Sequence, residues 1–205
     1  GSAPPWQGVR AFLDARAWRR RAVVSLGVPS SVRLTVETAA ADTVLSRLSG
    51  PVDIRGVSGD LTLVGLSGAV TAETVAGGVQ AQNPTGELWF RSVSGDLTVI
   101  DGDAARLRAT AVSGDLTLDL ATLVGGAHIG LRTVSGEVAV RVPAAADATV
   151  EVSTASGAVS SALEELTVTP RRGGHRVSGT LGSGGGTLRA ATVSGGVTLL
   201  RRPRW

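Results

Sequence analysis

The chain has 205 residues, a net charge of +3 and no cysteine, and all 20 of its basic residues are arginine. The absence of cysteine excludes disulfides and thiol chemistry, and no apolar run approaches the roughly 18 residues of a membrane-spanning helix. Because the excess of positive charge is small, we expect no nucleic-acid partner.

Residues 1–22 do not share the pattern of the rest of the chain. Val9, Phe12 and Leu13 are spaced as in a helix, and the basic run 19–21 follows them. This segment is either a basic amphipathic helix at a membrane surface or a cap over the first repeat, and we favour the cap. Gly1-Ser2 resembles a cloning remnant, so we expect any signal segment or membrane anchor to lie outside this sequence. Membrane proximity and localisation, cytoplasm or cell envelope, stay open.

A short repeat organises the remainder of the chain. The sequence Val-Ser-Gly-Asp-Leu-Thr stands at residues 57–62, 93–98 and 112–117, and looser copies begin at Val134, Ala155, Val177 and Val193. Between residues 49 and 94 the Ser-Gly step keeps a period of nine, and later copies are 16 to 22 residues apart. A fixed period is the signature of repeat architectures. We interpret two nonamers as one coil that contains two short strands.

Apolar and polar residues alternate within each nonamer, as in half-buried strands. The alternation places Val57, Leu61 and Leu63 on one inward face, together with Gly59. By the same count the inward residues of other coils include Val75, Val93, Leu97, Leu116, Val134 and Val193. One coil cannot bury its own apolar face, whereas stacked coils bury a continuous core.

The sequence therefore predicts an all-β solenoid of about eight short coils, wound in the right-handed sense. We assign residues 1–22 to an N-terminal basic segment and residues 23–205 to the solenoid domain. The alternative is an antiparallel β-sandwich, which also has turns every 8–12 residues. Near-identical copies in matched register favour the solenoid.

Three later segments depart from the regular repeat. We expect residues 143–147 to form a longer turn, residues 167–176 an exposed basic excursion, and residues 182–186 a glycine-rich turn in a shortened coil. The chain ends in the charged segment 201–205, which contains a proline. Charge and proline after a last strand blunt an exposed sheet edge.

A column of acids is the one candidate metal site. Asp96, Asp115 and Glu137 occupy equivalent positions, with Asp60 earlier on the same line, and a divalent cation could lie between stacked carboxylates. The calcium β-roll pattern requires more glycine and more acid in each nonamer than this chain has. We therefore favour a solvated acidic ladder and expect no metal and no cofactor.

No catalytic motif emerges from the remaining polar residues. The two histidines, His128 and His175, are far apart and have no carboxylate at a recognisable spacing, so a catalytic triad is unsupported. The glycine-rich segment 182–186 lacks the lysine of a phosphate loop. The alternation of inward and outward residues places Trp89 on the exposed face, and we expect the excursion around residue 170 to expose basic side chains. The candidate interaction residues are Trp89, Arg171, Arg172 and His175.

The reiterated Val-Ser-Gly-Asp-Leu-Thr, the lead-in 28–36 and the closing segments 177–182 and 192–199 resemble the toast-rack family of bacterial adhesin-like β-strand-repeat proteins. The resemblance covers about residues 22–202. It implies a β-solenoid domain of unknown function, found beside envelope-stress modules, and it implies no catalytic residues. The Arg-rich start departs from the family pattern.

These observations favour a non-enzymatic scaffold or interaction module, associated with envelope stress or adhesion, that binds a protein partner or a second copy of itself. A small-molecule substrate is not expected. A carbohydrate-binding or carbohydrate-active β-helix is the alternative, suggested by the acidic column and Trp89. A self-assembling polymer is a further alternative, because solenoid ends offer unpaired strand edges.

Overall fold

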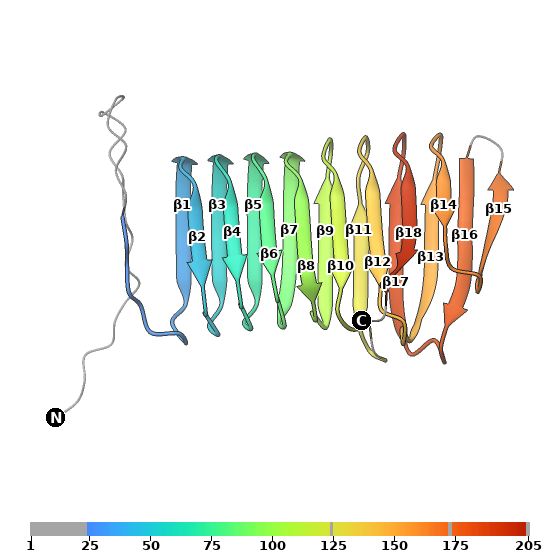
Figure 1. Cartoon of the computed structure of the whole chain (residues 1–205). Coiled ribbons are helices and arrows are strands. Elements are labelled where there is room, and N and C mark those ends of the chain that lie inside the picture. Colours follow the sequence, from blue (N-terminus) through green and yellow to red (C-terminus); the bar gives the residue numbers. More distant parts are fainter. Residues whose placement is uncertain (1–23, 124, 172–173, 204–205) are drawn as a thin grey trace.

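The computed structural model describes residues 24–123, 125–171 and 174–203, which form 18 strands in two sheets (Figure 1). The ten-stranded sheet contains, in spatial order, β1 (Leu34–Ala40), β3 (Val52–Ser58), β5 (Val70–Ala76), β7 (Glu87–Ser94), β9 (Arg106–Ala111), β11 (His128–Arg132), β17 (Gly186–Thr192), β13 (Ala148–Thr154), β16 (Gly174–Leu181) and β15 (Leu166–Arg171). The eight-stranded sheet contains β14 (Val159–Ser161), β18 (Val197–Arg201), β12 (Val138–Val142), β10 (Leu116–Leu120), β8 (Leu97–Gly102), β6 (Val79–Gln82), β4 (Leu61–Val64) and β2 (Thr43–Ser46).

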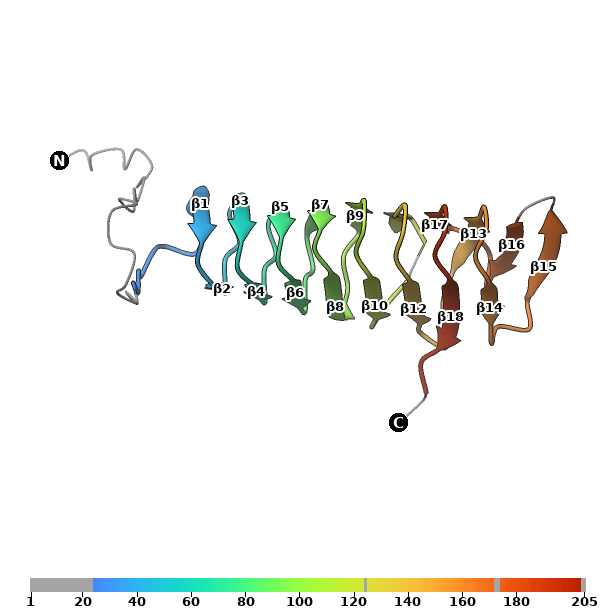
Figure 2. The ribbon, with the colours of Figure 1, turned by 90° about the horizontal axis from the view of Figure 1, so that it is seen from above.

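Each coil contributes one strand to each sheet, which confirms the predicted solenoid. Leu34 pairs with Val52, Val52 with Val70 and Val70 with Leu88, so equivalent residues recur every 18 positions, or two nonamers. The chain rises along the ten-stranded sheet and descends along the eight-stranded one as it advances from the N-terminal end, which is a right-handed winding (Figures 1 and 2). The pairing is parallel except around β16. An antiparallel sandwich is therefore excluded.

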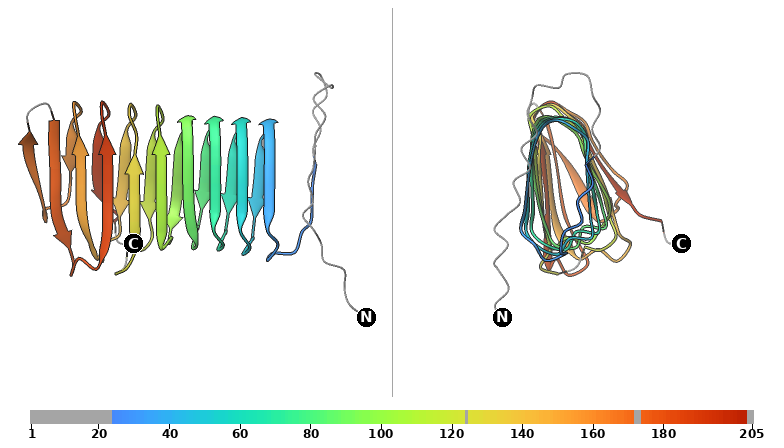
Figure 3. Two further views of the ribbon diagram at one scale, coloured as in Figure 1. Left: turned by 180° about the vertical axis from the view of Figure 1, so that it is seen from behind. Right: turned by 90° about the vertical axis from the view of Figure 1, so that its left-hand side faces the viewer.

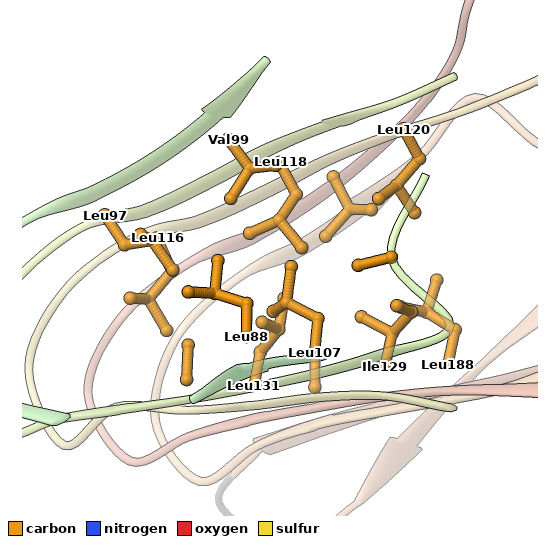
Figure 4. Packing of buried hydrophobic residues seen from close by; sticks show 14 of the residues in the cluster. Leu88, Leu97, Val99, Leu107, Leu116, Leu118, Leu120, Ile129, Leu131 and Leu188 are labelled. Carbon is orange, nitrogen blue, oxygen red and sulfur yellow. The ribbon is translucent and has the colours of Figure 1, made fainter. Parts of the chain in front are cut away.

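The core is one continuous apolar column between the two sheets. Leu97 and Leu116 of the eight-stranded sheet face Leu88 and Leu107 of the other sheet (Figure 4), and all four are almost completely buried. Consecutive coils add equivalent side chains at the strand spacing of about 4.8 Å. The view along the rod shows how closely the first coils superimpose (Figure 3).

The predicted inward position of the valine before each Ser-Gly step was wrong. Val57, Val75 and Val93 are 55%, 48% and 51% exposed, and their equivalents Val112, Val134 and Val193 are similar. These valines lie near or just beyond the ends of strands of the ten-stranded sheet, in which the inward parity is that of Leu88 and Phe90. Two successive outward residues, such as Val93 and Ser94, make the corner before the inward parity resumes at the glycine. Alternation counted from the following strand therefore fails across the corner.

The Ser-Gly step is a stacking device at this corner. A Cβ on Gly136 would lie 2.1 Å from the carbonyl oxygen of Gly114 in the preceding coil, and one on Gly114 would lie 2.3 Å from that of Gly95. The serine hydroxyls stack as well, because that of Ser94 donates to the carbonyl of Val75, 3.2 Å away. The repeat thus marks the place where successive backbones approach most closely.

The chain does not wind consecutively to its end. β17 lies between β11 and β13, and β18 lies between β12 and β14 (Figure 1). The chain passes from β12 to β13 and β14 and reverses through the antiparallel pair β15–β16. The last coil, made of β17 and β18, then lies between the coil of β11 and β12 and the coil of β13 and β14. In the segment 167–176, expected as an exposed excursion, residues 167–171 belong to β15 and residues 174–176 to β16. The turn 182–185, expected in a shortened coil, leads instead from β16 into β17.

The insertion also changes which strands form the edge of the rod. The C-terminal strand β18 is paired on both sides, so the charged segment that follows it does not blunt an edge, contrary to the prediction. At this end of the rod β15 is the edge strand of the ten-stranded sheet, and it contains Pro170, which has no N–H to offer to another strand. The predicted N-terminal segment 1–22 lies outside the described residues.

Asp147 fastens the turn 182–185, which leads from β16 into β17. Its carboxylate accepts hydrogen bonds from the backbone N–H of Gly185 at 3.1 Å and the hydroxyl of Ser183 at 3.0 Å. The Gly185 bond, followed by the Ser183 bond, holds the pKa of Asp147 below its ordinary value. A carboxylate whose pKa is lowered by folding stabilises the fold at pH values above its pKa in the unfolded chain. This contribution disappears as the pH falls through the pKa that the carboxylate has in the folded state.

We therefore expect Asp147→Ala to lower the melting temperature at pH 7, and the difference from the wild type to shrink as the pH falls below about 4. Thermal melts followed by circular dichroism across this range measure the effect. Asp53→Ala is the control, because Asp53 makes no side-chain hydrogen bond or ion pair in the described part of the chain. A difference that stays constant with pH would contradict the role given to the carboxylate.

Candidate functional site

A shallow groove of about 980 Å³ crosses the outer face of the ten-stranded sheet. It extends from Trp89 on β7 across β9, β11, β17 and β13 to His175 and Arg176 on β16. Its strands come from distant parts of the sequence, and the insertion of β17 is what places Arg189 beside β11. This part of the outer face of the ten-stranded sheet is therefore hollowed rather than flat.

Gly130 lies at the centre of this groove. Its two cross-strand neighbours are Arg108 on β9 and Arg189 on β17, and its neighbours along β11 on the same face are His128 and Arg132. A Cβ at Gly130 would meet no atom within 4 Å, so the glycine opens a hollow floored by bare backbone. The eight outward residues around this hollow are Arg106, Arg108, Thr110, His128, Arg132, Thr187, Arg189 and Ala191.

The residues around the hollow carry positive charge and no carboxylate. Arg106 pairs with Glu87 at 2.9 Å, and Arg189 approaches Glu151 at 3.4 Å, so both acids lie on the next strands outward. Arg108 and Arg132 form no ion pair with any described residue. The groove therefore has an excess of arginine, and the sheet does not neutralise it.

The N-terminal half of the same face shows the ordinary arrangement. There Glu73 lies between Arg55 and Arg91, with nitrogen-to-oxygen distances of 3.7 and 3.9 Å. Alternating charges on adjacent strands are favourable, whereas like charges repel. The uncompensated arginines around Gly130 thus depart from the pattern of the sheet itself.

Two contacts hold side chains at the groove in place. The guanidinium of Arg108 lies 5.1 Å from the centroid of the Trp89 ring, a cation–π contact. Nδ1 of His128 lies 2.8 Å from Oγ1 of Thr187, which fixes the imidazole ring. The ring nitrogen Nε2 has no hydrogen-bond partner in the described part of the chain.

The structure brings two of the four predicted interaction residues to this groove. Trp89 is 45% exposed at one end, and His175 lies at the other end, where its Nδ1 donates to the carbonyl of Gly157 at 3.2 Å. Arg171 is the last residue of β15, and its side chain is not among the described ones. Arg172 lies outside the described residues.

The arginines of the groove were missed by the sequence analysis. The signal was present, because Arg106 and Arg108 flank the buried Leu107, and Arg132 and Arg189 also have outward parity. Their convergence on Gly130 could not be inferred, since it depends on β17 pairing with β11.

The acidic column stacks as its spacing predicted. Oδ1 of Asp96 accepts from the backbone N–H of Asp115 at 2.8 Å, and Oδ1 of Asp115 accepts from that of Glu137 at 2.7 Å. Each carboxylate thus binds the backbone of the next coil. Within the described residues, no three His, Asp or Glu side chains are grouped so that they could hold a metal ion. The expectation that Asp96, Asp115 and Glu137 form a solvated acidic ladder without a metal stays a prediction.

In the described ranges no helix has the length and apolar character needed to cross a membrane.

Stacked two-strand coils around a single apolar column define a β-solenoid repeat protein. A family model described as Toastrack DUF4097 matches residues 87–200, more than half of the chain, and the chain belongs to this family. No curated protein and no solved structure matches it. The protein is therefore a toast-rack repeat scaffold, from a family of unknown function.

Proposed function

We propose that this scaffold is a non-enzymatic adhesion module that binds an extended acidic segment of a partner protein along the groove. The observation that carries the proposal is the excess of arginine in the groove, where Arg108 and Arg132 have no acid partner among the described residues, whereas Glu73 balances its neighbours in the N-terminal half of the same face. Arginine forks recognise carboxylates with paired hydrogen bonds, and an acidic segment would supply the charges that the sheet lacks.

Further support comes from the shape and the chemistry of the groove. It is shallow and open, and it crosses several strands, which suits an extended chain better than a small substrate enclosed in a pocket. Neither histidine hydrogen-bonds a carboxylate in the described structure, and their partners are Thr187 and a backbone carbonyl. A role at the bacterial cell envelope, which the adhesin-like resemblance implies, belongs to the same proposal.

The test is the binding of a fluorescent twelve-residue glutamate-rich peptide, measured by fluorescence polarisation at low and moderate salt. The groove variant combines Arg108→Gln, Arg132→Gln and Arg189→Gln. The matched control combines Arg33→Gln, Arg55→Gln and Arg91→Gln, which removes the same charge from the N-terminal half. We expect the groove variant to raise the Kd by about tenfold or more, or about 1.4 kcal/mol, and the control to change it by less than about twofold.

Equal weakening by the two variants would overturn the proposal, because binding would then follow net charge alone. Polygalacturonate that binds more tightly than the peptide, with the same dependence on the groove arginines, would also overturn it and support the carbohydrate alternative. A molar mass that rises with protein concentration in light scattering, and falls in the groove variant, would also overturn the proposal. It would indicate that the groove binds a second copy of the chain.

A further inference from the structure

The hollow over Gly130 has a geometry of its own within the groove. Arg108 and Arg189 lie on the strands either side of β11, two strand spacings or about 9.6 Å apart. Nothing stands between them, because Gly130 has no side chain and its Cβ position is open. This is the spacing of the two backbones, and each arginine side chain is long enough to bring its guanidinium group over Gly130 from its own side.

Other donors surround the same space. Arg132 follows Gly130 on the same face of β11, and His128 precedes it with its Nε2 free in the described structure. The two flanking guanidinium groups lie toward the outer strands, Arg108 over Trp89 of β7 and Arg189 against Glu151 of β13, so each turns inward to hold an anion over Gly130. The hollow is therefore bordered by hydrogen-bond donors on three strands, and of these the His128 ring is held in place by Thr187.

Glycine at this position needs a reason. In the middle of a strand it destabilises the sheet by about 0.5–1 kcal/mol relative to alanine, and it commonly marks a place where a ligand or another backbone approaches closely. No backbone approaches Gly130, in contrast to the corner glycines. The strand register is unbroken on both sides of Gly130, so the glycine marks no bulge, and the open face is consistent with the close approach of a ligand.

We propose that this hollow is a subsite for a single oxyanion, a phosphate, sulfate or carboxylate group of a larger ligand, held between Arg108 and Arg189 over Gly130. The subsite deepens the proposed function and rests on it, because it would seat one acidic group of the bound segment. Charge-assisted hydrogen bonds from paired guanidinium forks supply the affinity. The missing side chain admits the anion to the backbone floor.

The test uses sodium phosphate, sodium sulfate and sodium acetate as probes at constant ionic strength, with ¹⁵N-labelled full-length protein. We expect saturable shifts of the Gly130 amide and of the Arg108 and Arg189 Nε–H signals. Stronger binding of phosphate or sulfate than of acetate would assign the subsite to tetrahedral groups, and the reverse order would assign it to carboxylates. Shifts that grow linearly without saturation, or that spread over all exposed arginines, would overturn the proposal.

Gly130→Ile fills the hollow without changing any charge. We expect it to weaken binding of the best anion by about tenfold or more, whereas Ala139→Ile, on the outer face of β12, leaves the Kd unchanged. The double variant Arg108→Lys and Arg189→Lys keeps the charge but removes the forks, and it keeps the proposal testable if Gly130→Ile fails to fold. Binding by either altered protein with the wild-type Kd would overturn the subsite.

The two proposals fail in different ways. If the small anions saturate the hollow while the acidic peptide does not bind, the subsite stands and the adhesion function falls. If the peptide binds through the groove arginines and Gly130→Ile leaves its Kd unchanged, the function stands and the subsite falls.

Discussion

Gly136→Ala is expected to lower the free energy of unfolding by about 3 kcal/mol or more. A Cβ at this position would lie 2.1 Å from the carbonyl oxygen of Gly114 and 2.8 Å from its carbonyl carbon. Both are backbone atoms of the preceding coil, so relief requires the two coils to separate at the corner. That separation would strain the parallel pairing of β10 with β12 and open the core beneath it. Urea unfolding followed by circular dichroism measures the change.

The matched control is Gly130→Ala, the same substitution on the open face of the sheet. Its Cβ meets no atom within 4 Å, and alanine is better than glycine in a strand, so stability should be unchanged or slightly higher. A similar loss of stability in both variants would mean that loss of glycine flexibility, rather than coil stacking, explains the Ser-Gly repeat.

Leu97→Asp is expected to destabilise the protein by about 4 kcal/mol or more, a large part of the roughly 5–15 kcal/mol by which native domains are stable. Leu97 is completely buried, and its register partners Val79 and Leu116 continue the apolar column on either side. The substitution leaves a cavity and places an unpaired carboxylate in it. Thermal and urea melts give the magnitude, and loss of soluble protein is the limiting result.

Thr98→Ser is the companion variant on the next residue of β8. Thr98 points outward and is half-buried, so the change should cost less than about 0.5 kcal/mol. If both variants melted alike, the assignment of inward and outward faces in this coil would be wrong. A selective effect of Leu97→Asp would show that the central coils depend on one shared core.

The success of the sequence analysis depended on local repetition. Leu61, Leu97 and Leu116 were predicted to stack inward, and the structure confirms their register and burial. The same alternation failed for Val57 and Val93, because two outward residues in succession make the corner and reset the parity. The candidate site was likewise predicted only in part. Trp89 was found from its parity, whereas the basic hollow required knowledge of which strands are neighbours.

The sequence by itself determined the structure of a single coil and the way in which consecutive coils stack. The Ser-Gly period, the in-and-out alternation and the stacked acids are local properties, and each follows from residues within one or two nonamers. Only the tertiary structure decided the order of the coils, because strands of similar pattern can pair with one another equally well by local criteria. The hairpin β15–β16 reverses the chain and lets β17 and β18 insert beside β11 and β12. That long-range pairing brings Arg189 to Gly130, and with it the surface on which the proposed function depends.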